Sequence, residues 1–205
     1  QFDPEDTAGG TFAGFDGSAS TVPIMQQNLK TTYADLPGAA AIELPYVGEE
    51  VSMVLLLPDE GNFVGFERAL DADRLFEIFD ALETASGDLR LPRFEYETEV
   101  QLSEALSTLG MPVAFGSGAD FSGMVEGETS DLWIDEVYHQ AFVSVDEEGT
   151  EAAAATAVVM EESAPALSFD LTFDRPFLFC IRDRPTDAVL FLGRVTDAGG
   201  AQGGE

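Results

Sequence analysis

Basic side chains, histidine and cysteine are all scarce in this chain of 205 residues. Nine Lys and Arg residues stand against 39 Asp and Glu residues, which gives a formal net charge of −30, and there is one histidine and one cysteine. A single cysteine excludes an intrachain disulfide, and one histidine with one cysteine excludes the usual zinc sites. The sign of the charge disfavours binding to nucleic acid or to an anionic membrane.

The acidic residues are spread along the whole sequence and are not gathered into a tail. So large a charge repels itself and destabilises the compact state in dilute salt. Salt at about 1 M shortens the screening length to about 3 Å and removes most of that repulsion. The composition therefore predicts a protein adapted to high salt.

Long apolar runs and catalytic motifs are also missing. The longest apolar runs, such as residues 53–58, are too short for a membrane span or a signal peptide. There is no Gly-x-Ser-x-Gly nucleophile elbow and no Gly-rich phosphate loop. A Ser-His-Asp site would have to use His139, which alternates with Val137 and Ala141 on a strand predicted to be internal. His139 is therefore predicted to be a core residue, and we expect no enzyme, no metal and no cofactor.

The apolar patterns predict strands mixed with short helices. Two short strands are expected within residues 11–25, joined near the Asp16-Gly17 turn, and a strand containing Pro92 is expected to be an edge strand or to carry a bulge. The last two strands are apolar at nearly every position and are predicted to be covered on both faces, with Cys180 buried. Two further strands are expected at 39–44 and 51–57. Three helices are expected: one at 63–70, a second that begins after a cap at Asp71, and a third at 102–109 that ends before Gly110.

An unusual stretch joins a β pattern to a run of alanines. Val143 and Val145 alternate with polar residues, and Glu147-Glu148-Gly149-Thr150-Glu151 then leads into four alanines and Thr156. Alanine favours a helix, so a surface helix or a linker is one interpretation. The other is a strand whose small side chains let it enter a space between two strands that are already packed.

The stretch resembles the hinge of the reactive loop of a serpin. Three further segments follow the family pattern in its order: FGSGADFSG at 115–123, DRPFLF at 174–179 and FLGRV at 191–195. The resemblance implies an α+β serpin fold, with a multi-sheet β core, short helices and an exposed reactive loop at about 149–175. Residues 1–205 would then be the C-terminal portion of a single serpin domain whose N-terminal part is missing. The family also suggests a monomer when full length and an extracellular location, with any targeting segment upstream.

The resemblance implies a suicide-substrate inhibitor of serine endopeptidases. A protease would cut the loop and form an acyl-enzyme, and the freed loop would insert into the large sheet as a new strand. The hinge would comprise Glu147, Gly149, Thr150, Glu151, Ala152, Ala153, Ala154, Ala155 and Thr156. Glu147 matches an acidic residue at the top of the loop that pairs with a basic group, unless it is an ordinary surface acid. His139 matches a histidine that supports the opening of the sheet.

The cut bond decides specificity. Counting from Gly149 as the family does places the bond between Ser163 and Ala164, with Met160-Glu161 and Glu162-Ser163 as alternatives. No Arg or Lys lies nearby, which indicates an elastase-like or subtilisin-like target and not a trypsin-like one. A non-inhibitory serpin, acting as a chaperone or binding protein, is the alternative function. Small residues at the inward positions Thr150, Ala152, Ala154 and Thr156 favour inhibition. An acidic interaction protein or a hydrolase using His139 are weaker alternatives.

Overall fold

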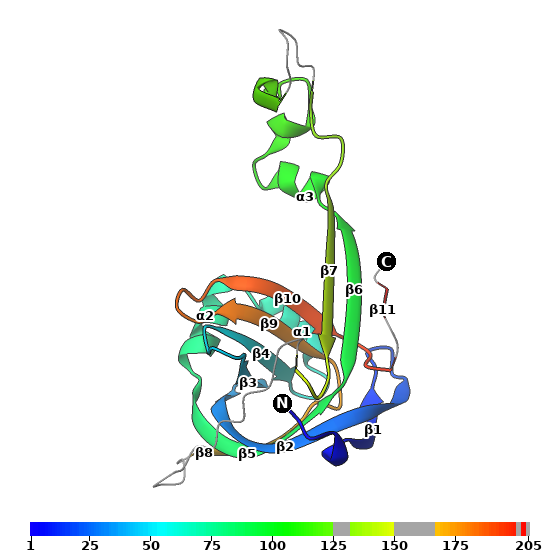
Figure 1. Ribbon diagram of the computed structural model, residues 1–205, viewed down its shortest axis with the longest axis vertical. Coiled ribbons are helices and arrows are strands. Elements are labelled where there is room, and N and C mark those ends of the chain that lie inside the picture. Colours follow the sequence, from blue (N-terminus) through cyan, green and yellow to red (C-terminus); the bar gives the residue numbers. More distant parts are fainter. Residues whose placement is uncertain (125–131, 150–166, 200–201, 204–205) are drawn as a thin grey trace. The chain divides into compact units, whose positions relative to one another are not determined.

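The structure is a computed structural model that describes residues 1–124, 132–149, 167–199 and 202–203 (Figure 1). Its chain divides into two compact units, one formed by residues 1–95 and 144–201 and the other by residues 96–143 and 202–205. Each unit is described separately below.

The first unit is built on a mixed sheet, which has eight strands among the described residues. The sheet order is β10-β9-β4-β3-β2-β5-β8, with β1 paired to β2. All neighbours are antiparallel except β5 and β8, which run parallel. The strands are β1 (Ala8–Ala13), β2 (Ala19–Leu36), β3 (Ala39–Pro45), β4 (Val51–Pro58), β5 (Glu83–Pro92), β8 (Leu167–Thr172), β9 (Phe177–Asp183) and β10 (Val189–Val195).

Two short helices pack against one face of this sheet. They are α1 (Phe63–Ala69) and α2 (Ala72–Asp80), and a 3₁₀ turn, η1 (Pro4–Asp6), precedes β1. Asp71 caps α2 as predicted, because its carboxylate accepts the Arg74 N–H at 2.9 Å. The helices and strands share one apolar cluster, which includes Ala41, Val54, Leu56, Phe66, Ile78, Phe79, Leu178 and Cys180.

The opposite face of β9 packs into a group of phenylalanines. The ring of Phe177 lies 5.0 Å from that of Phe173 and 5.6 Å from that of Phe94. Since Leu178 and Cys180 belong to the helix-covered cluster, β9 is buried on both faces, as predicted. Burial also raises the pKa of the Cys180 thiol to about 12.

The same prediction is wrong for β10. Leu190, Phe191 and Leu192 are 52%, 46% and 58% exposed. Figure 1 shows β10 at the end of the sheet, beyond β9. Its only strand partner among the described residues is β9, and no described element covers these side chains.

The second unit contains most of β6 (Phe94–Gln101) and of β7 (Tyr138–Val145). The first two residues of β6 and the last two residues of β7 belong to the first unit. They form a sheet with β11 (Gln202–Gly203) in the order β11-β6-β7. The helix α3 (Ser103–Thr108) follows β6, and Gly110 beyond it has a φ of 111°, as its predicted cap role requires. Two 3₁₀ turns, η2 (Pro112–Phe115) and η3 (Ser122–Met124), come next.

The expected strand through Pro92 is two strands. Pro92 ends β5 opposite Ile24, and Arg93 separates it from β6. Since β5 lies between β2 and β8, it is not an edge strand, and that alternative is wrong; the other alternative, an irregularity at Pro92, corresponds to the break at Arg93. Proline has no N–H to donate to the ladder, and β5 ends at this residue. The predicted β1–β2 and β3–β4 pairs are present, although β2 runs on to Leu36. None of the described helices could cross a membrane.

Candidate functional site

The hinge begins in a tight turn directly after β7. The Gly149 N–H donates to the carbonyl oxygen of Asp146 at 3.1 Å, and the Asp146 carboxylate accepts the Glu148 N–H at 2.9 Å. Gly149 has a φ of 93°, and a Cβ placed on it would meet no other atom within 4 Å. Glycine is favoured here by backbone conformation and not by lack of space.

Glu147 lies inside this turn and is only 6% exposed. Its Oε1 accepts the Arg93 Nε–H at 3.0 Å and an Nη2–H at 2.6 Å, and the Thr7 hydroxyl donates to the same oxygen. The main chain is held as well, since the Phe2 N–H donates to the Glu147 carbonyl at 3.0 Å. Glu147 therefore pairs with a basic group, and its interpretation as an ordinary surface acid is wrong. We call Glu147, Arg93 and Thr7 the hinge cluster.

The electrostatics of the hinge cluster favour the ionised carboxylate. Burial by itself would raise the pKa of Glu147, but the hydrogen bonds from Arg93 and Thr7 outweigh it, and the pKa is lowered. The Arg93 side chain is 46% exposed, so water screens the pair in part. The cluster thus holds the turn through ionised, partly screened hydrogen bonds that join residues far apart in sequence.

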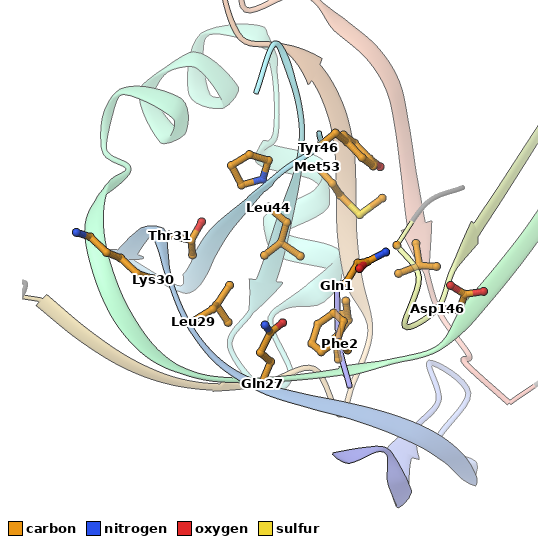
Figure 2. Close-up of a pocket in the computed structure, with 14 residues that line it drawn as sticks. Gln1, Phe2, Gln27, Leu29, Lys30, Thr31, Leu44, Tyr46, Met53 and Asp146 are labelled. Carbon is orange, nitrogen blue, oxygen red and sulfur yellow. The ribbon is translucent and has the colours of Figure 1, made fainter. Parts of the chain in front are cut away.

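A cavity of about 220 Å³ adjoins the hinge turn (Figure 2). Its polar lining includes Gln1, Gln27, Lys30 and Asp146, and Gly149 also borders it. Its apolar lining includes Phe2, Leu29, Leu44, Met53, Leu91 and Val145. A small amphipathic molecule would suit these walls.

The described chain resumes at β8, which lies within the range of about 149–175 predicted for the reactive loop. Leu167 is opposite Ala85 in the parallel β5–β8 pair. A Cβ on Gly87 would lie 1.8 Å from the Phe169 carbonyl oxygen, so the close approach of the two strands requires glycine. Gly149 and Leu167 thus both lie in the first unit. The other hinge residues (Thr150, Glu151, Ala152, Ala153, Ala154, Ala155 and Thr156) and the bond candidates (Met160, Glu161, Glu162, Ser163 and Ala164) lie outside the described residues.

His139 is exposed on β7, which contradicts its prediction as a core residue. The reason is that β7 has one strand neighbour, β6, among the described residues, and Tyr138 and Phe142 are each 61% exposed. Within the described part of the chain, no group of three or more acidic, His or Cys side chains could hold a metal ion.

A model of the serpin (serine protease inhibitor) family matches residues 1–198. The chain belongs to the serpin family. It is 41% identical over 187 residues to leukocyte elastase inhibitor of Sus scrofa, covering 87% of this chain and 49% of that one. It is 38% identical to an uncharacterized serpin-like protein of Thermococcus kodakarensis, covering 95% of this chain and 46% of the relative.

Solved serpins share the fold. The native thermophilic serpin tengpin matches with a TM-score of 0.79 and 30% identity, over 96% of this chain and 51% of its own. Thyroxine-binding globulin in complex with thyroxine matches with a TM-score of 0.79 and 27% identity, over 97% of this chain and 53% of its own. The predicted serpin fold is therefore confirmed, and this serpin chain spans about half the length of the relatives that it matches.

Two members of the hinge cluster were not anticipated from the sequence. Arg93 follows Pro92 at a strand boundary and is one of only nine basic residues, which is a weak signal that it has a structural partner. Thr7 carries no such signal. The family resemblance indicated that Glu147 has a basic partner but did not identify it.

Proposed function

We propose that the protein containing this chain is an inhibitor of serine endopeptidases that acts as a suicide substrate. The observation that carries the proposal is the anchored hinge: Glu147 is held by Arg93 and Thr7 two residues before Gly149. A fixed turn at the start of the loop gives the freed strand a defined point from which to insert. The relationship to leukocyte elastase inhibitor supports this assignment.

The proposed mechanism has two steps. The protease serine attacks one peptide bond of the loop and forms an acyl-enzyme, releasing the new amino terminus. The segment from Thr150 onward then inserts as a new strand into the sheet that accepts the cleaved loop in the serpin family. Each ladder hydrogen bond gained contributes about 0.5–1.5 kcal/mol. Thr150, Ala152, Ala154 and Thr156 would point inward and require little volume, and this favours insertion before deacylation.

We propose Ser163–Ala164 as the cut bond and an elastase-like or subtilisin-like protease as the target. No basic residue lies between Gly149 and Asp174. A trypsin-like protease, which needs Arg or Lys before the bond, would find no site there.

The test uses the full-length protein in high salt with a subtilisin-like protease. A covalent complex on a denaturing gel, with the released C-terminal peptide identified by mass spectrometry, is the expected result. Thr150→Arg or Ala152→Arg should turn the inhibitor into a substrate, because the inserted charge would be buried without a partner. Glu151→Arg, on the outward face, is the matched control and should still trap protease. Equal trapping by all three variants would refute the insertion step.

A non-inhibitory binding protein is the second candidate, favoured by the cavity of about 220 Å³ beside the hinge. A solved relative, thyroxine-binding globulin, is in complex with thyroxine. Loop cleavage by several proteases with no covalent complex would support this function over inhibition.

A further inference from the structure

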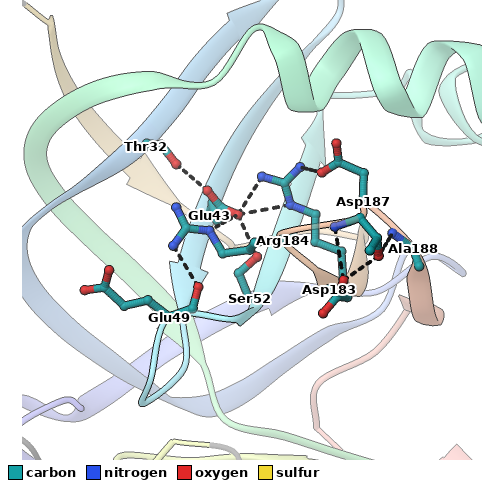
Figure 3. A network of polar contacts seen from close by, with 10 residues as sticks. Thr32, Glu43, Glu49, Ser52, Asp183, Arg184, Asp187 and Ala188 are labelled. Carbon is teal, nitrogen blue, oxygen red and sulfur yellow. Dashed lines mark hydrogen bonds and ion pairs between the residues drawn. The ribbon is translucent and has the colours of Figure 1, made fainter.

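A second buried charge, Glu43, lies on β3. Glu43 is 2% exposed, and its carboxylate accepts hydrogen bonds from Ser52 at 2.6 Å and Thr32 at 2.8 Å (Figure 3). Arg182 of β9 donates to Glu43 Oε1 through Nε at 3.1 Å and Nη2 at 2.7 Å, and Arg184 Nε lies 3.5 Å from the same oxygen. These side chains bridge β2, β3, β4 and β9, and they do not belong to the hinge cluster.

Arg182 itself is almost fully enclosed, with 7% exposure. Its guanidinium lies 4.2 Å from the centre of the Phe79 ring on α2, and its Nη1 donates to Asp187 at 2.8 Å. The guanidinium thus has an aromatic cover and two carboxylate partners. If Arg182 were shifted by two residues along β4, its guanidinium would not have the same set of partners.

The apolar part of β9 does not fix its own register. Residues 53–57 of β4 and 177–181 of β9 are apolar at every position, so a slip of two residues in either direction still sets four of the five residues 177–181 opposite apolar residues of the neighbouring chain segment. Such a slip preserves the face on which each side chain lies. Packing alone therefore distinguishes the native register only weakly from its nearest alternatives.

The charged residues do distinguish the native register from these alternatives. In the native register Arg182 is opposite Ser52, beside Glu43. A slip of two residues moves Arg182 by about 7 Å along β4. A slip in one direction sets Cys180 opposite Ser52 and leaves Glu43 as a buried, unpaired carboxylate. A slip in the other direction sets Arg184 opposite Ser52, but it moves Arg182 opposite the fully buried Val54, away from its carboxylate partners. Each slip therefore leaves a buried charge without its partner, which is strongly unfavourable.

We propose that the Glu43–Arg182 pair fixes the register in which β9 joins the sheet, and with it the placement of the segment that follows the reactive loop. That segment supplies both ends of the sheet order, β8 beside β5 and the β9–β10 hairpin beside β4. Its register must therefore be set by contacts with the earlier strands. Register selection is the best-attested role of buried polar pairs. The inference does not depend on whether the protein inhibits a protease.

The single cysteine provides a direct test. Cys180 is opposite Val54 in the native register, so Val54→Cys should form a disulfide with Cys180 when the refolded full-length protein is oxidised. Leu56→Cys would reach Cys180 only after a slip of two residues, because a disulfide needs Cα atoms within about 7 Å. Mass spectrometry of the cross-linked peptides measures each register separately.

Glu43→Leu with Arg182→Met removes both charges and keeps apolar volume. In this background the Leu56→Cys cross-link should rise roughly tenfold or more, while the Val54→Cys cross-link falls. The matched control is Glu67→Leu with Arg194→Met, which removes an ion pair of 3.2 Å whose arginine side chain is 61% exposed. The control should keep the native cross-link only.

Two results would overturn the proposal. One is an unchanged ratio of the two cross-links after Glu43→Leu with Arg182→Met. The other is failure of that double variant to fold, since the pair would then be needed for net stability and not for choice of register. Circular dichroism of the variant before oxidation separates these two outcomes.

Discussion

Replacing Glu147 by glutamine tests the hinge cluster with the least change of shape. The substitution removes the negative charge that accepts two N–H bonds from Arg93, at 3.0 and 2.6 Å, and one O–H bond from Thr7. Hydrogen bonds to a charged group contribute about 1.5–3 kcal/mol. Arg93 is nearly half exposed, and exposed pairs contribute about 0–1 kcal/mol. We therefore expect Glu147→Gln to lower the free energy of unfolding by about 1–2 kcal/mol.

Urea unfolding at pH 7, followed by circular dichroism, measures the loss. Glu148→Gln is the matched control, because Glu148 is the exposed neighbour and loses the same charge. Hydrogen exchange provides a local measurement: the Phe2 amide, bonded to the Glu147 carbonyl, should exchange faster in Glu147→Gln than in the control. A double-mutant cycle with Arg93→Met then isolates the pair itself.

The reasoning fails if Glu147→Gln and Glu148→Gln agree within about 0.5 kcal/mol, the usual range of surface substitutions. It also fails if Glu147→Gln and Arg93→Met are additive. Additivity would mean that the two side chains are close to each other without stabilising the turn.

Four further predictions concern the rest of the molecule. Burial would raise the pKa of Glu43, but hydrogen bonds from Ser52, Arg182 and Thr32 outweigh it and the pKa is lowered; the pKa of Glu147 is lowered too. The stability that these two carboxylates contribute is present above the unfolded pKa of about 4.3 and is lost as pH falls through their folded pKa values. The free energy of unfolding should therefore decline below about pH 4.5. A flat profile from pH 7 to acid would contradict this. Arg182→Met alone should cost about 3–5 kcal/mol in urea unfolding, whereas Glu43→Leu with Arg182→Met should cost far less; equal losses would contradict the argument. Cys180, buried with a pKa of about 12, should react with a thiol reagent only on unfolding, and rapid labelling of the native protein would show that β9 opens. With a net charge of −30, thermal stability should rise from about 0.1 M to about 3 M KCl, and a constant melting temperature would refute adaptation to salt.

Local signals in the sequence predicted local structure well. The turn residues between β3 and β4 and the cap at Asp71 each act within a few residues, so a pattern in the sequence specifies them almost completely. The hinge motif was also recognisable, because its glycine and small residues are contiguous. These features need no knowledge of how the chain packs.

The buried charges could not be predicted in this way. Glu43 lies in a predicted strand, but its partner Arg182 is 139 residues away, and Arg93 is 54 residues from Glu147. An acidic residue in a strand normally faces water. Only the strand order β9-β4-β3 brings Arg182 beside Glu43, and that order results from long-range pairing, which the local pattern does not encode.

The two wrong burial predictions have one cause. His139 on β7 and the apolar residues of β10 were expected to be covered because their strands look internal. An apolar pattern indicates which faces favour burial, but it does not identify the element that buries them. The prediction succeeds for β9, whose neighbours β4 and β10 both belong to this chain. It fails for β7 and β10, each of which has one strand neighbour among the described residues, in a chain that spans about half the length of its relatives.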